Sequence, residues 1–131
     1  IIGMPRITTA AEWCDYYATP VKRGIVVLFK AVRDDYLSKH GMSYQPGTKP
    51  VAPDWDPQPE CGGGLHFSPH PTLARDFDGQ ATRYVACPVR LKDIVVHEDA
   101  QYPAKVKAPW VCAPVWECDE DGQPLPDTGD E

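Results

Sequence analysis

The stretch Cys61-Gly-Gly-Gly-Leu-His-Phe-Ser-Pro-His-Pro-Thr-Leu-Ala-Arg-Asp-Phe77 combines a glycine turn, a strand and the start of a helix. Its glycines allow the backbone to take a positive φ or to pass close to another group, because no Cβ atom obstructs it. The apolar residues 65–67 favour a short strand, and Pro71 suits the first helical position because its missing N–H would have no partner there. We expect five side chains with chemical potential at this joint: Cys61, His66, Ser68, His70 and Arg75.

Composition and charge indicate one folded domain followed by an acidic tail. The chain has 131 residues, of which 42% are hydrophobic, and single domains most often contain about 100–150 residues. Seven of the 19 acidic residues lie between Glu117 and Glu131, a segment without Lys or Arg. We therefore predict a single α+β domain over residues 5–117 and a flexible acidic tail over residues 118–131. The rest of the chain is nearly neutral, which gives no indication of a surface that coats nucleic acid.

The cysteines and the apolar segments indicate a cytoplasmic protein. Five cysteines occur without a C-x-x-C pair, a usage typical of reduced thiols in the cytoplasm. The longest apolar run, residues 25–29, is far shorter than the roughly 20 residues that a membrane helix needs. No secretory signal is visible. We therefore expect reduced thiols and no membrane partner.

The remaining pattern predicts short strands and two small helices, an α+β fold. A helix is expected over residues 9–18, because a threonine followed by Glu12 resembles a capping box. Continuous β-branched and aromatic residues predict a strand buried on both faces at residues 24–32, and a second strand covers residues 81–90. The other expected elements are a helical turn at residues 34–39, a brief strand and turn at 42–47, a short strand within 91–97 and a last strand at 107–117.

A proline-rich segment, residues 46–59, is predicted to be a loop. It contains five prolines, which support neither a helix interior nor a central strand. Loops of this length inside a compact domain are often lids or binding loops. Trp55 in its middle predicts that the loop packs back on the body of the domain.

The order of these elements resembles the ADP-ribosyltransferase-like fold. Residues 27–32 are similar to the first strand of that family, where an aromatic residue precedes the His or Arg that binds NAD. Residues 63–68 and the helix behind them resemble the family's Gly-(Ile/Val)-Tyr-Phe-(Ala/Ser/Thr) motif, and residues 83–91 are similar to the apolar strand that follows. The resemblance implies a split antiparallel sheet of short strands with two small helices, and an NAD-binding cleft.

Three departures from the family concern the site rather than the fold. Lys30 lies where the family has His or Arg, and His66 lies where it has the stacking Tyr. Where a transferase places its Glu, this chain has Lys107-Ala-Pro109, and Glu117 comes too late in the strand. A transferase needs such a carboxylate to stabilise the oxocarbenium-like charge. The resemblance therefore leaves open whether the chain is an enzyme.

The residues and the resemblance together predict a nucleotide- or NAD-type site. Lys30 would neutralise a phosphate, while His66 and Phe67 would line the base or nicotinamide. Ser68 and the helix start would take a second phosphate. The rest of the predicted cofactor-binding set is Gly63, Gly64 and Arg75. In this interpretation the protein is a nucleotide- or NAD-binding domain, a diverged ADP-ribosyltransferase of phage–host or toxin–defence systems.

Zinc is a second candidate cofactor. Cys61, His66 and His70 are ligand types that zinc prefers, and a further cysteine could complete the set. The same cysteine with either histidine could instead form a nucleophilic thiolate–imidazolium pair, and an ordinary structural role also explains all three residues. The alternative function is thus a non-enzymatic protein-interaction module, stabilised by zinc and binding a host protein. The Gly-Leu-His-Phe core is also similar to that of small bacterial and phage proteins, a resemblance that implies no function.

Overall fold

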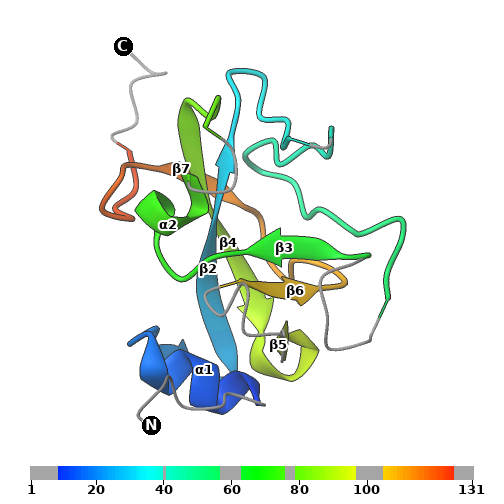
Figure 1. The fold of residues 1–131 in the computed structure, drawn as a ribbon, viewed down its shortest axis with the longest axis vertical. Helices are drawn as coiled ribbons and strands as arrows, with labels where there is room; N and C mark the ends of the chain where they lie inside the picture. Colours follow the sequence, from blue (N-terminus) through cyan, green and yellow to red (C-terminus); the bar gives the residue numbers. More distant parts are fainter. Residues whose placement is uncertain (1–8, 40, 57–62, 76–78, 97–104, 126–131) are drawn as a thin grey trace, which may run out of the picture.

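The computed structural model describes residues 9–39, 41–56, 63–75, 79–96 and 105–125. In this part of the chain the elements are, in order (Figure 1), α1 (Ala10–Tyr16), β1 (Val21–Lys22), β2 (Ile25–Val32), β3 (Leu65–Phe67), α2 (Pro71–Arg75), β4 (Arg83–Arg90), the 3-10 helix η1 (Leu91–Asp93), β5 (Val95–Val96), β6 (Val106–Ala108) and β7 (Trp116–Cys118).

The strands form two antiparallel sheets, with the orders β1-β2-β4-β7 and β3-β6-β5. The longest pair, β2 and β4, stays in register over the eight residues of each strand. The sheets meet where Phe29 of β2 and Ser68, just after β3, exchange two backbone hydrogen bonds of 2.9 Å. In Figure 1, β3 and β6 run across the direction of β2 and β4. The predicted α+β class is confirmed, and the antiparallel strands are divided between two sheets.

The core lies between the two sheets, with α1 packed at one end (Figure 1). It uses alternate residues of each strand, because successive side chains of a strand point to opposite faces. The buried core residues from the strands are Val26, Leu28, Val32, Leu65, Phe67, Val85, Cys87, Val89, Val96, Val106 and Ala108. Trp13 of α1 is fully buried against them. On the other face of β2, Ala31 packs with Ala74 of α2 and with Ala81, so β2 is covered on both faces as predicted.

Helix α1 begins at the predicted capping box. The Thr9 hydroxyl accepts a hydrogen bond from the Glu12 N–H at 3.2 Å, and the Glu12 carboxylate accepts one from the Thr9 N–H at 3.1 Å. The helix ends at Tyr16, earlier than predicted. Ala18 has a φ of 58°, and a left-handed residue cannot continue a right-handed helix.

The predicted helical turn over residues 34–39 is wrong. The chain reverses direction instead: the Arg33 N–H donates to the Leu37 carbonyl at 3.0 Å, and the Tyr44 N–H donates to the Tyr36 carbonyl at 2.8 Å. Tyr36 has a φ of 65°, a left-handed conformation that interrupts any helix. We call this segment the reversal after β2.

The predicted last strand over residues 107–117 is also wrong as a single element, because β6 and β7 belong to different sheets. Pro109 and Pro114 lie between them, and neither has an N–H to give to a ladder. The intervening chain pairs irregularly with the proline-rich loop, as where the Val111 N–H donates to the Pro50 carbonyl at 3.0 Å. The alternating apolar pattern therefore continued through a segment that is not a strand.

The described part of the acidic tail differs from the predicted flexible segment. Cys118 belongs to β7 and is buried. The Asp119 carboxylate accepts hydrogen bonds from two backbone N–H groups that follow it, each at 2.9 Å. Gly122 lies against the ring of Phe29. The folded domain thus extends beyond the predicted boundary, and residues 126–131 lie outside the described residues.

Candidate functional site

The glycine turn ahead of β3 lies under the proline-rich loop. A Cβ atom at Gly63 would overlap the carbonyl oxygen of Asp54, so a residue without a Cβ is needed for the two backbones to pass this closely. Gly64 has a φ of 138°, and its N–H donates to the Asp54 carboxylate at 3.2 Å. The Trp55 ring lies against the same glycine. The predicted close approach and positive φ of the glycine turn are confirmed, and so is the predicted packing of Trp55 on the body. The predicted cofactor-binding role of Gly63 and Gly64 stays a prediction.

Lys107 of β6 shares one face of the smaller sheet with His66 of β3 and Val95 of β5. The three residues are opposite one another in the antiparallel register, and side chains in such positions project from the same face. Lys107 is fully buried. Its Nζ lies 5.7 Å from the centre of the Trp55 ring, which is within the range of a cation–π contact.

The Lys107 ammonium has no hydrogen-bond partner among the residues that the structure describes. Removing an ammonium from water costs several kcal/mol unless hydrogen bonds or an opposite charge compensate it. A desolvated cation–π contact contributes about 2 kcal/mol, so the Trp55 ring offsets only part of that cost. The contacts of the described residues therefore compensate the buried Lys107 ammonium only in part.

Lys30 lies on the core-facing side of β2, over the ring of Tyr44. Its Nζ is 5.7 Å from the ring centre, and Tyr44 packs edge-on against Phe67 with ring centres 6.3 Å apart. Burial raises the pKa of the Tyr44 hydroxyl above its ordinary value of 10.0, and the charges of Cys87 and Asp54 raise it further.

The structure brings only some of the predicted site residues together. Gly64 and His66 lie next to Lys107, and Gly63 lies against Asp54. Lys30 and Phe67 belong to a different group, because both contact the Tyr44 ring. The Phe67 ring belongs to the core, and Ser68 is buried where it pairs with Phe29. Arg75 is exposed at the end of α2. That helix packs on Ala31, so it covers the face of β2 opposite to Lys30.

The sequence interpretation missed Lys107 as a site residue and placed it only where a family carboxylate was expected. The signal that could have indicated it is a lysine between Val106 and Ala108, both apolar, in a short strand. Such a lysine is either exposed on one face of the strand or buried with a structural or functional role. The sequence does not show that Trp55 lies over it, because the two residues meet only in the fold.

The structure describes two of the three predicted metal ligands. Cys61 lies outside the described residues, while His66 is in β3 and His70 is exposed just before α2. Among the residues that the structure describes, no group of three or more His, Cys, Asp or Glu side chains could hold a metal ion. The zinc prediction, which depends on Cys61, stays a prediction.

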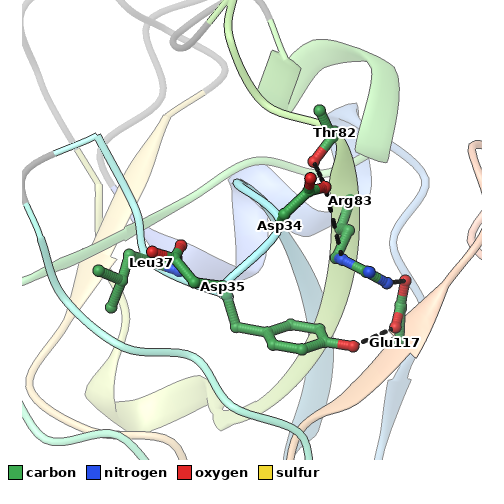
Figure 2. A network of polar contacts seen from close by, with 7 residues as sticks. Asp34, Asp35, Leu37, Thr82, Arg83 and Glu117 are labelled. Atoms are coloured by element: carbon green, nitrogen blue, oxygen red, sulfur yellow. Dashed lines mark hydrogen bonds and ion pairs between the residues drawn. The ribbon is translucent and has the colours of Figure 1, made fainter.

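A second polar cluster joins β4, β7 and the reversal after β2 (Figure 2). Arg83 Nη1 donates to Glu117 Oε2 at 3.0 Å, and the Tyr36 hydroxyl donates to Glu117 Oε1 at 2.8 Å. The Arg83 guanidinium also lies over the Tyr36 ring, 5.0 Å from its centre. The Asp34 carboxylate is 3.9 Å from Arg83 Nε and accepts a hydrogen bond from the Thr82 hydroxyl at 2.6 Å.

These contacts stabilise the protonated forms of Tyr36 and Arg83. The hydrogen bond to Glu117 raises the pKa of Tyr36 above 10.0, with smaller contributions from burial and from the Glu117 charge. The hydrogen bond to the same carboxylate also raises the pKa of Arg83 above its ordinary value. The cluster fixes the reversal after β2 to the larger sheet. Sequence reasoning missed it because Tyr36 and Glu117 are 81 residues apart in the chain.

Comparison of the chain with protein-family models, with curated proteins and with solved structures finds no match. Within the described ranges, no helix has the length and apolar character needed to cross a membrane.

Proposed function

We propose that the protein is a nucleotide- or NAD-type ligand-binding domain, with the ligand held where the glycine turn, Trp55 and Lys107 meet. The observation that carries this proposal is the fully buried Lys107 ammonium, which has no hydrogen-bond partner among the described residues. An ADP-ribosyltransferase-like arrangement of the two sheets is part of the proposal. It is supported by the pairing of Ser68, just after β3, with Phe29 of β2.

A phosphate group has the chemistry that this point of the sheet requires. Hydrogen bonds between an ammonium and a phosphate oxygen are short and strong, because both groups are charged. The flat face of Trp55 suits a base or nicotinamide, and such stacking contributes about 1–3 kcal/mol per base. Charge and ring together favour a nucleotide over a simple anion.

Access to Lys107 requires a movement of Trp55. The Trp55 ring is half-buried and lies over both Gly64 and the Lys107 ammonium. Asp54, the preceding residue, holds this part of the loop to the glycine turn through a hydrogen bond of 3.2 Å. Ligand binding should therefore change the tryptophan fluorescence of the protein.

We propose binding rather than a transfer reaction. Glu117 is the acid nearest to the family's catalytic position, and both of its carboxylate oxygens are engaged, by Arg83 and by Tyr36. The protein would then be a diverged relative of the transferases that keeps a ligand-binding cleft. The resemblance places such a protein in phage–host or toxin–defence systems.

The test is a thermal-shift and tryptophan-fluorescence titration with NAD, ADP-ribose and ATP. A ligand at 100 times its dissociation constant should stabilise the fold by about 2.7 kcal/mol. Lys107→Met should abolish the response to the ligand that binds, whereas Lys39→Met, which removes an exposed lysine, should leave it unchanged. If no nucleotide changes either signal, or if Lys107→Met responds as the unmodified protein does, the proposal is wrong.

The alternative is a non-enzymatic interaction module that binds a host protein. It is favoured by two exposed apolar residues, Val51 and Trp110, which are 58% and 46% exposed and form a β-bridge with each other. Stoichiometric zinc by elemental analysis, together with loss of the fold on chelation and no response to any nucleotide, would support this alternative and its predicted zinc site.

A further inference from the structure

A cavity of about 580 Å³ lies between the β1–β2 turn and the junction of β4 with η1. One side is formed by Arg23, Gly24 and Ile25, and the other by residues 90–92. A backbone hydrogen bond of 2.8 Å from the Leu91 N–H to the Gly24 carbonyl holds the two sides together. The volume is within the range of small-molecule sites, about 300–1,000 Å³. None of these residues belongs to the Lys107 region, by which we mean the glycine turn, Trp55 and Lys107.

The lining combines three cations with an apolar floor. Arg23, Arg90 and Lys92 are exposed, and Ile25 and Leu91 are half-buried between them. No acidic residue lines the cavity. None of the three cations makes a side-chain hydrogen bond or ion pair with a residue in the described ranges. The groove therefore has an uncompensated positive charge next to apolar surface.

The turn that carries Arg23 has a left-handed backbone conformation, which asparagine adopts more easily than arginine. Arg23 and Gly24 form a two-residue hairpin loop, between Lys22 and Ile25, with φ values of 54° and 75°. Hairpin loops with a positive φ at both positions strongly favour Asn-Gly. An arginine at a positive φ is uncommon, and strained conformations of this kind concentrate at functional sites. The turn thus keeps a guanidinium at the groove where an asparagine would fit the backbone better.

We propose that this groove is a binding site for a phosphate-bearing small molecule with at least two negative charges. Guanidinium groups bind phosphate oxygens in pairs with matched geometry, and a lysine adds a point charge. The floor of Ile25 and Leu91 would contact the apolar part of the ligand. The site is separate from the Lys107 region and does not depend on the nucleotide proposal.

The experiment titrates inorganic pyrophosphate into the full chain and follows the backbone amide NMR signals of Gly24 and Leu91. Ionic strength is kept constant with chloride. We expect saturable shifts, and a loss of affinity of about fivefold or more in Arg23→Asn, since exposed charge pairs contribute modestly. Because asparagine fits the turn, this variant should melt at the same or a higher temperature. Loss of binding would then not reflect unfolding.

Two control variants separate the possible outcomes. Lys22→Gln removes an exposed cation beside the turn that does not line the cavity, and it should change the affinity by less than about twofold. Lys107→Met should leave the pyrophosphate shifts at Gly24 and Leu91 unchanged, which separates this site from the proposed nucleotide site.

Three results would overturn the proposal. The first is the absence of saturable shifts. The second is an equal loss of pyrophosphate affinity in Lys22→Gln and Arg23→Asn, which would indicate unspecific attraction only. The third is preferred, strongly salt-dependent binding of a single-stranded oligonucleotide. The last result would indicate a nucleic-acid surface instead, because counterion release makes such binding fall steeply with salt.

Discussion

Arg83 and Lys107 both lie against an aromatic ring, but they differ in burial and in hydrogen bonding. Arg83 is 5.0 Å from the Tyr36 ring centre and donates a hydrogen bond to Glu117 at 3.0 Å. Lys107 is 5.7 Å from its ring centre and has no hydrogen-bond partner among the described residues. The Arg83 side chain is 37% exposed, whereas Lys107 is fully buried. The more buried cation is the one without an acceptor.

The difference separates a structural contact at Arg83 from the proposed binding position at Lys107. The charge of Arg83 is balanced, and its contacts fix the reversal after β2 to β4 and β7. An unbalanced buried charge such as that of Lys107 lowers stability. Sequences that break a local rule in this way usually do so at functional sites. This contrast supports the structural role of the Arg83 cluster and the proposal of ligand binding at Lys107.

A large effect on this comparison should come from Gly63→Ala. The added methyl group would overlap the Asp54 carbonyl, so the loop that carries Trp55 must move away from Lys107. Overpacking of this kind costs about 1–3 kcal/mol, which urea denaturation would measure. Tyr36 and Glu117 lie in the other cluster, so the phenol titration of Tyr36 should not change.

Gly79→Ala is the matched control, because an added Cβ there meets no atom within 4 Å. It should leave the free energy of unfolding within about 0.5 kcal/mol of that of the unmodified protein. Equal effects of the two substitutions would contradict the close packing of the loop over Lys107.

A smaller effect is a loss of folding stability at alkaline pH, which we expect from Tyr44 and Tyr36. Burial raises the pKa of Tyr44, and the hydrogen bond to Glu117 raises that of Tyr36. A phenol with a raised pKa in the folded state stabilises that state below its ordinary pKa of 10.0, and the contribution is lost as pH rises further. For Tyr44 the loss should be up to about 1.4 kcal/mol per pH unit.

Urea denaturation at about pH 8 and about pH 11 would measure this loss. Tyr44→Phe should lose less stability between the two values than the unmodified protein, because phenylalanine does not ionise. Tyr16→Phe, which changes an exposed tyrosine, should behave as the unmodified protein does. Parallel losses in Tyr44→Phe and the unmodified protein would show that Tyr44 is not the group responsible.

The sequence predicted those parts of the fold that depend on local chemistry. The capping box at Thr9 and Glu12 needs only residues within one helical turn, and it is present. The continuous apolar run of β2 predicted a strand covered on both faces, which α2 and the core provide. The glycine turn was predicted from the freedom of glycine alone, and Gly63 and Gly64 use that freedom in two different ways.

The parts that depend on contacts between distant segments were not predictable. The apolar alternation through residues 107–117 indicated one strand, because periodicity carries no information on which sheet a residue joins. The Glu117 carboxylate comes 34 residues after Arg83 and 81 after Tyr36, so neither spacing is a motif. Lys107 lies against Trp55 of the proline-rich loop, a contact between segments that are distant in the sequence.

The most direct test of the central claim compares Lys107→Met with Arg83→Met by urea denaturation, without added ligand. Methionine keeps much of the apolar stem of each side chain and removes the charge. We expect Lys107→Met to raise the free energy of unfolding by about 1–4 kcal/mol, because an uncompensated buried charge is removed. Arg83→Met should lower it, because Glu117 loses its cation. If Lys107→Met destabilises the protein as Arg83→Met does, Lys107 is a structural residue and the assigned binding position is wrong.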